Sequence, residues 1–470
     1  MLDLSWGDVI AAPRLQTAAD LARPVPECPP DTSVMEAARL MSGAGSSAIL
    51  VRRGDSYGIV TDEDFRRRVV AGGLPGDTPI SEVMSGGVHT VTSDRLVEDV
   101  VIEMLRTNHH HLPVTDGGRL VGLVSHLDIL DAEVLEPFRM VREIAAAGNP
   151  VALAEIARDV PASVAATVKA GLTPFRATEV MSLLVDALTR RLLENAQDEV
   201  GVPPCAWAWI ALGSHGRREQ AIATDQDHAL IYEDPEMDPY FADLAARVVE
   251  GLEACGIPRC ESGVMASEPG WRLPPDEWIQ RTRRWIMEPA LERAFLGEIV
   301  FDFRQIAGEF PGEATLGQAL EVARRHPPFI HRLAVLAVKH RIPLRRFGGG
   351  ISAPGGRVDI KDGGLRALTE FGRLFGIQVG CMSSSTKARL QAAAAASVVE
   401  PEEASALDEA LTVLMEVRLL HQLRRWEKGE PIDEQVRIAE LGRIERVRLA
   451  QALRAVRSAQ QSWEARLATT

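Results

Sequence analysis

The sequence predicts a multidomain protein that joins α/β units to an all-α region. Three observations indicate this fold class. An internal repeat has copies that begin near Asp31 and Ser93, an apolar strand followed by a polar turn and two aspartates runs from Cys205 to Tyr232, and helical periodicity dominates beyond Gly312. The 470 residues suffice for about three domains of ordinary size.

The composition excludes some classes of partner. Lys and Arg number 52 against 66 Asp and Glu, which gives a formal net charge of −14 and opposes loose binding to nucleic acid or to anionic membranes. No stretch approaches the roughly 20 apolar residues of a membrane span, and the first residues do not resemble a signal peptide. We therefore expect a cytoplasmic protein. Five scattered cysteines are expected to be buried or idle thiols.

Each copy of the repeat predicts a small β-α-β-β-α unit. An amphipathic helix is followed by an apolar strand, a turn and a second strand that runs into another helix. Val34 and Met41 of the first copy correspond to Val97 and Met104 of the second. This unit is the first α/β part of the fold.

Both copies end their second strand with a hydroxyl three residues before a carboxylate, Thr61 with Asp64 and Ser125 with Asp128. This spacing is typical of a helix capping box. The same groups could bind a nucleotide, with backbone donors holding phosphate and the carboxylate accepting two ribose hydroxyls. The spacing alone leaves both interpretations open.

The tandem arrangement resembles a CBS-domain pair over residues 18–135. This resemblance implies an adenosine nucleotide in the cleft between the repeats, with Thr61, Asp64, Ser125 and Asp128 as ligand residues. Exposed helices of such a pair also lead us to expect a homodimer.

Residues 136–200 predict a helical connector, which Pro203 and Pro204 end. An apolar strand then runs to Leu212 and turns at Gly213 and Ser214, where backbone amides and a hydroxyl could hold a triphosphate.

Asp225 and Asp227 lie two apart at the start of the next strand. Because side chains alternate along a strand, both should point to one face, where one or two Mg²⁺ ions could bind. A third carboxylate is expected nearby, and Asp302 supplies one within the apolar run IVFDFR. The alternative for Asp302 is a salt bridge to Arg304 or another arginine; we favour the metal site.

The motif GSHGRREQ…TDQDHALIY is similar to that of the nucleotidyltransferases that follow CBS pairs, which are similar to PII-uridylyltransferases. The similarity runs from about residue 150 to the C-terminus. It implies phosphate contacts by Gly213 and Ser214, and magnesium binding by Asp225, Asp227 and Asp302, which are also the catalytic residues. Two histidines, His215 and His228, depart from the family pattern, which commonly has an acid and an asparagine there.

Near this motif, Arg217 is a plausible phosphate contact, with Glu219 as its structural partner. Residues 263–267 predict a strand, and three tryptophans spaced seven apart predict core positions: Trp271, Trp278 and Trp285. The catalytic domain is expected to span residues 201–310.

Residues 311–470 predict a helical bundle, which the resemblance implies is a substrate-binding domain. A glycine-rich interruption from Gly348 to Leu365 surrounds Lys361. Lys361 becomes a phosphate-binding residue if this segment folds over Asp225 and Asp227; otherwise the segment is a surface turn. Arg418 and Arg424 are further basic candidates.

The sequence thus predicts Mg²⁺-dependent transfer of a nucleoside monophosphate from a nucleoside triphosphate to an acceptor, regulated by adenosine nucleotide on the CBS pair. The acceptor is unknown and could be a small regulatory protein, a metabolite or the chain itself. The alternative is a non-catalytic regulatory protein that only senses nucleotide.

Overall fold

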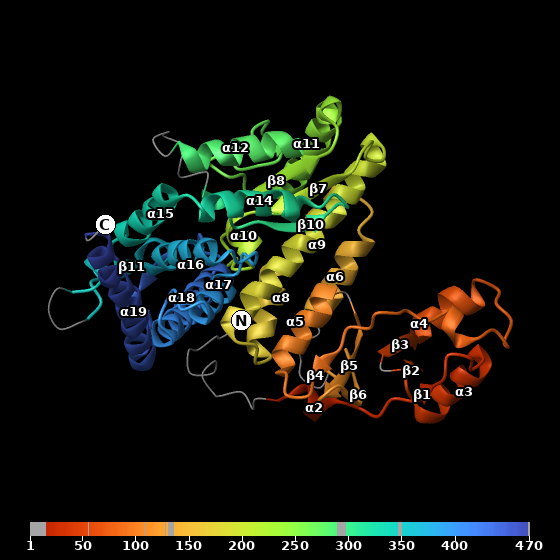
Figure 1. Ribbon diagram of the computed structural model, residues 1–470. Coiled ribbons are helices and arrows are strands. Elements are labelled where there is room, and N and C mark those ends of the chain that lie inside the picture. The colour runs from red at the N-terminus through yellow and green to blue at the C-terminus, as the bar shows by residue number, and fades with distance from the viewer. Residues whose placement is uncertain are drawn as a thin grey trace. The chain divides into compact units, whose positions relative to one another are not determined.

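The computed structural model describes residues 16–54, 56–107, 109–126, 128–129, 136–288, 298–345 and 350–468. The chain forms two compact units, one within residues 10–136 and the other from Pro137 onward. Figure 1 traces the chain from red at the N-terminus to blue at the C-terminus. Among the described residues, no helix combines the length and apolar character needed to cross a bilayer.

The smaller unit contains two copies of one β-α-β-β arrangement, as the repeat predicts. The strand order is β1-β2-β3 in one copy and β4-β5-β6 in the other; in each, the first pair is parallel and the second antiparallel. The elements are α2 (Ala18–Leu21), β1 (Glu27–Cys28), α3 (Val34–Ala44), β2 (Ala48–Arg53), β3 (Ser56–Thr61), β4 (Val91–Thr92), α5 (Val97–Thr107), β5 (His111–Asp116) and β6 (Arg119–Ser125).

A helix follows the last strand of the first copy: α4 (Asp62–Asp64) continues into the π-helical turn η1 (Phe65–Val70). The short 3-10 helix η2 (Ile80–Glu82) comes next. The predicted helix of the second copy falls largely on residues 130–135, outside the described residues. Val34 and Met41 are buried against Ile49 and Val60, so the apolar face of α3 packs on the sheet as its periodicity predicts.

The predicted connector is part of the larger unit. It contains α6 (Glu136–Ala146), α7 (Pro150–Ala157), α8 (Val160–Lys169) and α9 (Pro174–Val200). Thr173 caps α9, accepting a hydrogen bond from the N–H of Arg176, and Pro174 occupies its first turn. Helix α9 packs against α8, α11 and α18 and is largely buried. It is therefore a core helix rather than an exposed linker.

A four-stranded mixed sheet with the order β10-β7-β8-β9 follows. Its strands are β7 (Trp207–Ala211), β8 (His228–Tyr232), β9 (Arg272–Leu273) and β10 (Arg304–Ala307), and every residue of β7 and β8 is buried. Strand β7 pairs antiparallel with β8 and β10, while β8 pairs parallel with β9. The strand predicted over residues 263–267 is wrong, because these residues form turns and the strand begins at Arg272.

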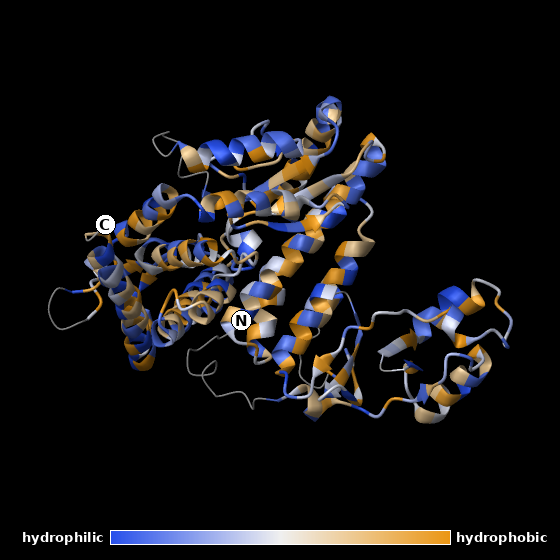
Figure 2. Cartoon of the chain, viewed as in Figure 1, coloured by the Kyte–Doolittle hydropathy of each residue, from blue (hydrophilic) through white to orange (hydrophobic). Residues whose placement is uncertain are grey.

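Helices α11 (Asp238–Ala254), α12 (Pro275–Met287) and α14 (Gly312–Arg324) accompany the sheet. Helix α12 is mostly hydrophilic, yet it buries one face that includes Trp278 (Figure 2). Trp271 and Trp278 are buried with ring centroids 5.9 Å apart, which confirms them as core residues.

A helical bundle completes the larger unit. Its helices are α15 (Pro327–Lys339), α16 (Arg366–Val379), α17 (Thr386–Ala395), α18 (Pro401–Glu427) and α19 (Arg443–Leu467), and its shorter elements are η5 (Pro354–Gly356), β11 (Arg357–Asp359), η6 (Lys361–Leu365), β12 (Gln435–Arg437) and η7 (Ile438–Glu440). Residues of the sheet and of the bundle share one apolar cluster, in which Ile210 and Leu414 are both fully buried. Sheet and bundle are therefore positioned together.

Candidate active site

Two glycines bring the turn after β7 into direct contact with neighbouring segments. Helix α10 (Gly213–Arg217) starts where β7 ends. Gly213 has a φ of +57°, and a Cβ atom on it would lie 2.8 Å from Asp227 Oδ2. A Cβ atom on Gly216 would lie 1.8 Å from the backbone oxygen of Asp302. Both positions therefore require glycine, and the turn packs directly against Asp227.

The predicted convergence of Asp225 and Asp227 is confirmed. The N–H of Leu212 donates to the carbonyl of Asp227 (2.9 Å), which fixes the segment beside the end of β7. A ligand atom from each of Asp225, Asp227 and Cys260 lies within 4.8 Å of the other two, and within the described ranges no other group of three such residues was found. Cys260, for which the sequence predicts a buried or idle thiol, is buried and is the third member of the cluster.

The electrostatics of the cluster favour a cation. Burial and the nearby charge of Asp225 raise the pKa of Asp227 to about 7, although Cys260, Lys361 and Arg217 act in the opposite direction. Burial also raises the pKa of Cys260 to about 11, so it is a neutral thiol at pH 7. The two carboxylates fit Mg²⁺, which prefers oxygen ligands, whereas the thiol is a softer donor.

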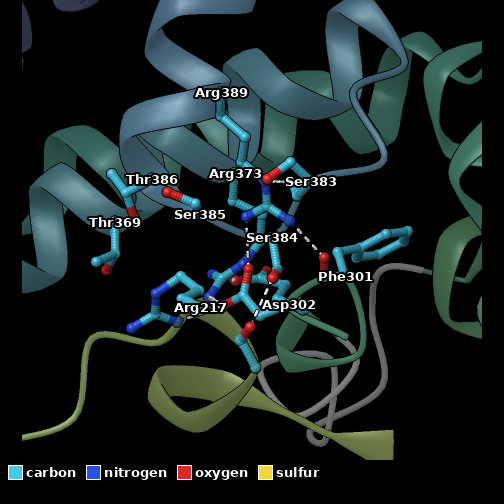
Figure 3. A network of polar contacts seen from close by, with 12 residues as sticks. Arg217, Phe301, Asp302, Thr369, Arg373, Ser383, Ser384, Ser385, Thr386 and Arg389 are labelled. Carbon is cyan, nitrogen blue, oxygen red and sulfur yellow. Dashed lines mark hydrogen bonds and ion pairs between the residues drawn. The ribbon is translucent and has the colours of Figure 1, made fainter. Parts of the chain in front are cut away.

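The prediction that Asp302 completes the metal site requires correction. Both of its oxygens are occupied by guanidinium groups: Oδ2 accepts from Arg217 (2.5 Å) and Arg373 (2.6 Å), and Oδ1 accepts from Arg389 (2.6 Å) (Figure 3). Burial alone would raise the pKa of Asp302, but the charges of the three arginines outweigh it and hold the pKa well below its ordinary value. Asp302 is fully buried in a turn before β10, and it anchors arginines instead of a metal ion.

This arginine cluster joins the sheet to the bundle. Arg373 belongs to α16 and Arg389 to α17, whereas Arg217 belongs to α10. Glu219 accepts from Arg217 Nε (2.7 Å) and from the N–H of Thr386 (2.9 Å), which confirms it as a structural partner of Arg217. The network therefore fixes Arg217 relative to the helices that face it.

A small pocket lies between Asp225 and the bundle, and we call it the carboxylate pocket. Its volume is about 70 Å³, and it is lined on the sheet side by Ser214, Arg217, Glu219, Ala223, Thr224 and Asp225 and on the bundle side by Lys361, Leu365, Arg366, Thr369, Met415 and Arg418. This volume suits a phosphate-sized group; complete small-molecule sites are typically about 300–1,000 Å³. The pocket is therefore too small to enclose a whole nucleotide.

The segment around Lys361 does fold toward the aspartates. Lys361 lines the same pocket as Ser214 and Asp225, and its charge lowers the pKa of Asp227. Lys361 was predicted to bind phosphate only if its segment folds over the aspartates, and this condition is met. The alternative of a surface turn is wrong, because Lys361 is the first residue of the short helix η6. Gly348 and Gly349 lie outside the described residues. Arg418 also lines the pocket and is held by Glu434 (2.6 Å).

The two histidines that depart from the family pattern are structural. His215 is buried, and its Nε2 lies 2.7 Å from Oδ1 of Asp186 on α9. His228 Nδ1 accepts from the N–H of Ala266 (3.0 Å), so its Nε2 carries the proton and donates to Gln226. Burial lowers the pKa of His228 to about 3 and keeps the ring neutral.

In the smaller unit, both hydroxyl–carboxylate motifs form capping boxes. Asp64 Oδ2 accepts from the N–H and the hydroxyl of Thr61 (both 2.9 Å), and Asp128 Oδ2 accepts from the N–H (2.8 Å) and the hydroxyl (2.7 Å) of Ser125. Both aspartates act electrostatically on the half-buried His111, so the two motifs face a common region. The side chains of Asp64 and Asp128 are 15% and 16% exposed.

Sequence reasoning missed three residues of the larger site. Cys260 carries no local signal, because a single cysteine in an irregular segment looks idle. Arg373 and Arg389 do carry one: each is a charged residue at a buried position of its helix, and such a residue needs a partner.

Three family models match the chain. The CBS domain matches residues 18–71 and 80–135, the family described as Putative nucleotidyltransferase DUF294 matches residues 158–292, and the Putative nucleotidyltransferase substrate binding domain matches residues 327–467.

Curated relatives match over the repeat region. The CBS domain-containing protein YhcV of Bacillus subtilis (strain 168) is 36% identical over 101 residues, 21% of this chain and 72% of that protein. The CBS domain-containing protein CBSCBSPB2 of Arabidopsis thaliana is 36% identical over 96 residues, 20% of this chain. The match spans only 18% of the length of this Arabidopsis relative.

Solved structures match the same region. A putative signal-transduction protein with CBS domains from Burkholderia ambifaria MC40-6 is 30% identical with a TM-score of 0.24, and the match covers 25% of this chain and 93% of that one. A CBS domain protein from Pyrobaculum aerophilum, solved in complex with AMP, is 24% identical with a TM-score of 0.23, and the match covers 24% of this chain and 89% of that one.

Proposed function

We propose that this chain, which belongs to the family of CBS-domain proteins that carry a DUF294 nucleotidyltransferase domain and its substrate-binding domain, transfers a nucleoside monophosphate from a triphosphate to an acceptor. One observation carries the proposal. Asp225 and Asp227 converge within 4.8 Å, and Asp225 lies in one pocket with Ser214 and Lys361. This arrangement supports the proposal, because carboxylate oxygens that could bind a divalent cation lie beside a hydroxyl and an ammonium group that could bind phosphate.

Each side of the carboxylate pocket has a distinct role in this proposal. Asp225 and Asp227 would hold Mg²⁺, which when bound neutralises charge on the phosphate oxygens. Ser214 and Gly213 would contact the triphosphate from the sheet side. Lys361 and Arg217 would neutralise its charge, and the arginine cluster keeps Arg217 in place.

The function is tested first by nucleotide binding, which needs no acceptor. In isothermal titration, a non-hydrolysable triphosphate should bind the full chain in Mg²⁺ and much more weakly in EDTA. Lys361→Ala should weaken this binding, whereas Lys387→Ala, a surface lysine paired with Asp408 (3.1 Å), should not. Binding that is equal with and without Mg²⁺ would contradict the proposal.

The raised pKa of Asp227 predicts a pH dependence of metal binding. In the folded, metal-free protein Asp227 loses its proton near pH 7, but near its ordinary pKa of 3.8 when unfolded. Between these values the folded state binds more protons, so the free energy of unfolding falls as pH rises through this window. Because the metal requires the ionised form, Mg²⁺ affinity should increase as pH rises through about 7. Titrations one unit below and above that pKa measure this, and equal affinities would contradict it.

We also propose that the CBS pair binds an adenosine nucleotide that regulates transfer. The support is that the two capping-box aspartates face one region around His111 and that their side chains are 15% and 16% exposed. Here Thr61 and Ser125 would position Asp64 and Asp128 to accept ribose hydroxyls.

Adenosine nucleotide should therefore stabilise the smaller unit of the full chain. At one hundred times its dissociation constant, a ligand adds about 2.7 kcal/mol to the state that binds it. In Asp64→Ala/Asp128→Ala this ligand-dependent rise in melting temperature should disappear. Loss of the caps alone costs about 1 kcal/mol each, equally with and without nucleotide, so an unchanged ligand-dependent rise in the variant would contradict the proposal.

A further inference from the structure

A second, larger pocket lies against the other face of the short helix that carries Lys361. Its volume is about 470 Å³, within the range of small-molecule sites. We call it the basic pocket. It is lined by Leu336, Lys339, His340, Arg341, Pro343, Ser352, Pro354, Arg357, Val358, Asp359, Asp362, Gly363 and Arg366. All of them lie within residues 327–467, which match the model of the substrate-binding domain.

The charge of this pocket is opposite to that of the chain. Four cations line it against two carboxylates, Asp359 and Asp362, in a protein of net charge −14. Burial lowers the pKa of His340, so it adds no charge at pH 7. An excess of positive charge in a concave site attracts anions.

Most of this positive charge is not neutralised within the protein. Arg366 pairs with Asp362 (2.9 Å), but Lys339, Arg341 and Arg357 have no carboxylate within ion-pair distance among the described residues. Asp359 accepts from Gln435 Nε2 and from the N–H of Asp362 (both 2.7 Å). Three exposed cations are thus left to bind an anionic group.

The basic pocket adjoins the carboxylate pocket. Arg366 lines both, and η6 separates them, with Asp362 and Gly363 on one side and Lys361 and Leu365 on the other. The two pockets therefore share one wall residue, Arg366, whose side chain is exposed.

We propose that the basic pocket binds the carboxylate or phosphate group of a small-molecule acceptor. This inference rests on the proposed transferase function and gives its acceptor a chemical class. The cations hold the anionic end, while the nucleophilic hydroxyl at the other end enters the carboxylate pocket. The hydroxyl oxygen forms the new bond to the α-phosphorus, the bond from that phosphorus to the β-phosphate oxygen breaks, pyrophosphate leaves and the hydroxyl proton passes to solvent.

Anion binding by the full chain tests the pocket without NTP or metal. Titrations with inorganic phosphate and with citrate distinguish a phosphate from a carboxylate ligand. In Arg341→Glu/Arg357→Glu, which changes two exposed side chains, affinity for the preferred anion should fall at least tenfold. Arg454→Glu, an exposed arginine of α19 outside both pockets, should bind like wild type. No binding by wild type, or equal binding by the charge-reversal variant, would overturn the inference.

A second measurement concerns the acceptor itself. Full chain, α-labelled triphosphate and Mg²⁺ are incubated with the dialysable fraction of a cell extract and, separately, with its macromolecular fraction. Label in an anionic dialysable product, reduced in the charge-reversal variant, supports the inference; label only in macromolecules overturns it and leaves the transferase function intact.

Discussion

Asp302→Ala should destabilise the larger unit by about 3–5 kcal/mol, because removing one partner of a buried ion pair leaves uncompensated charge. Three guanidinium groups converge on this carboxylate, which is fully buried. Urea unfolding followed by tryptophan fluorescence measures the effect, since Trp207 and Trp209 lie on the adjoining strand β7.

A surface ion pair provides the matched control. Asp243 pairs with Arg247 (3.1 Å), and its side chain is 54% exposed. Asp243→Ala removes the same carboxylate but should cost less than about 1 kcal/mol. If Asp302→Ala were no more destabilising than Asp243→Ala, the arginine cluster would not be holding the sheet to the bundle.

Asp227→Asn should abolish nucleotidyl transfer while leaving the protein at least as stable. The loss of one carboxylate from the pair should remove several kcal/mol of transition-state stabilisation. Burial disfavours the ionised form of Asp227, so a neutral, isosteric side chain should raise the free energy of unfolding at pH 8 or leave it unchanged. Parallel rate and unfolding measurements are required, with Asp198→Asn, an exposed position near the end of α9, as the control.

This combination distinguishes a functional carboxylate from a structural one. A structural Asp227 would lose stability and transfer together. Transfer at the wild-type rate in Asp227→Asn would remove the residue from the active site.

The sequence predicted the elements whose signals are local. The repeat is visible because its two copies share apolar positions such as Met41 and Met104, and both are fully or nearly buried. Asp225 and Asp227 could be paired because alternation along a strand fixes the face of residues two apart. Whether Lys361 lies near Asp225 depends on the tertiary fold. The sequence could therefore predict a phosphate-binding role for Lys361 only on the condition that its segment folds over the two aspartates.

The predictions for Asp302 and for residues 263–267 failed. The position of Asp302 within an apolar run indicates a buried carboxylate whose negative charge needs a positive partner. The sequence alone does not distinguish a metal ion from an arginine as that partner. The deciding residues, Arg373 and Arg389, lie 71 and 87 positions further along the chain. Residues 263–267 look like a strand because they are apolar, yet they are buried in turns that contact His228.

The central claim is most directly tested by pyrophosphate release from the full chain. Each of the four triphosphates is supplied with Mg²⁺ and a cell extract as the source of acceptor, and wild type is compared with Asp227→Asn. We predict release by wild type that requires Mg²⁺, with the label from the α-phosphate appearing in a new product, and no release above background by the variant. Release at the same rate by both proteins, or nucleotide binding without any release by wild type, would contradict the account.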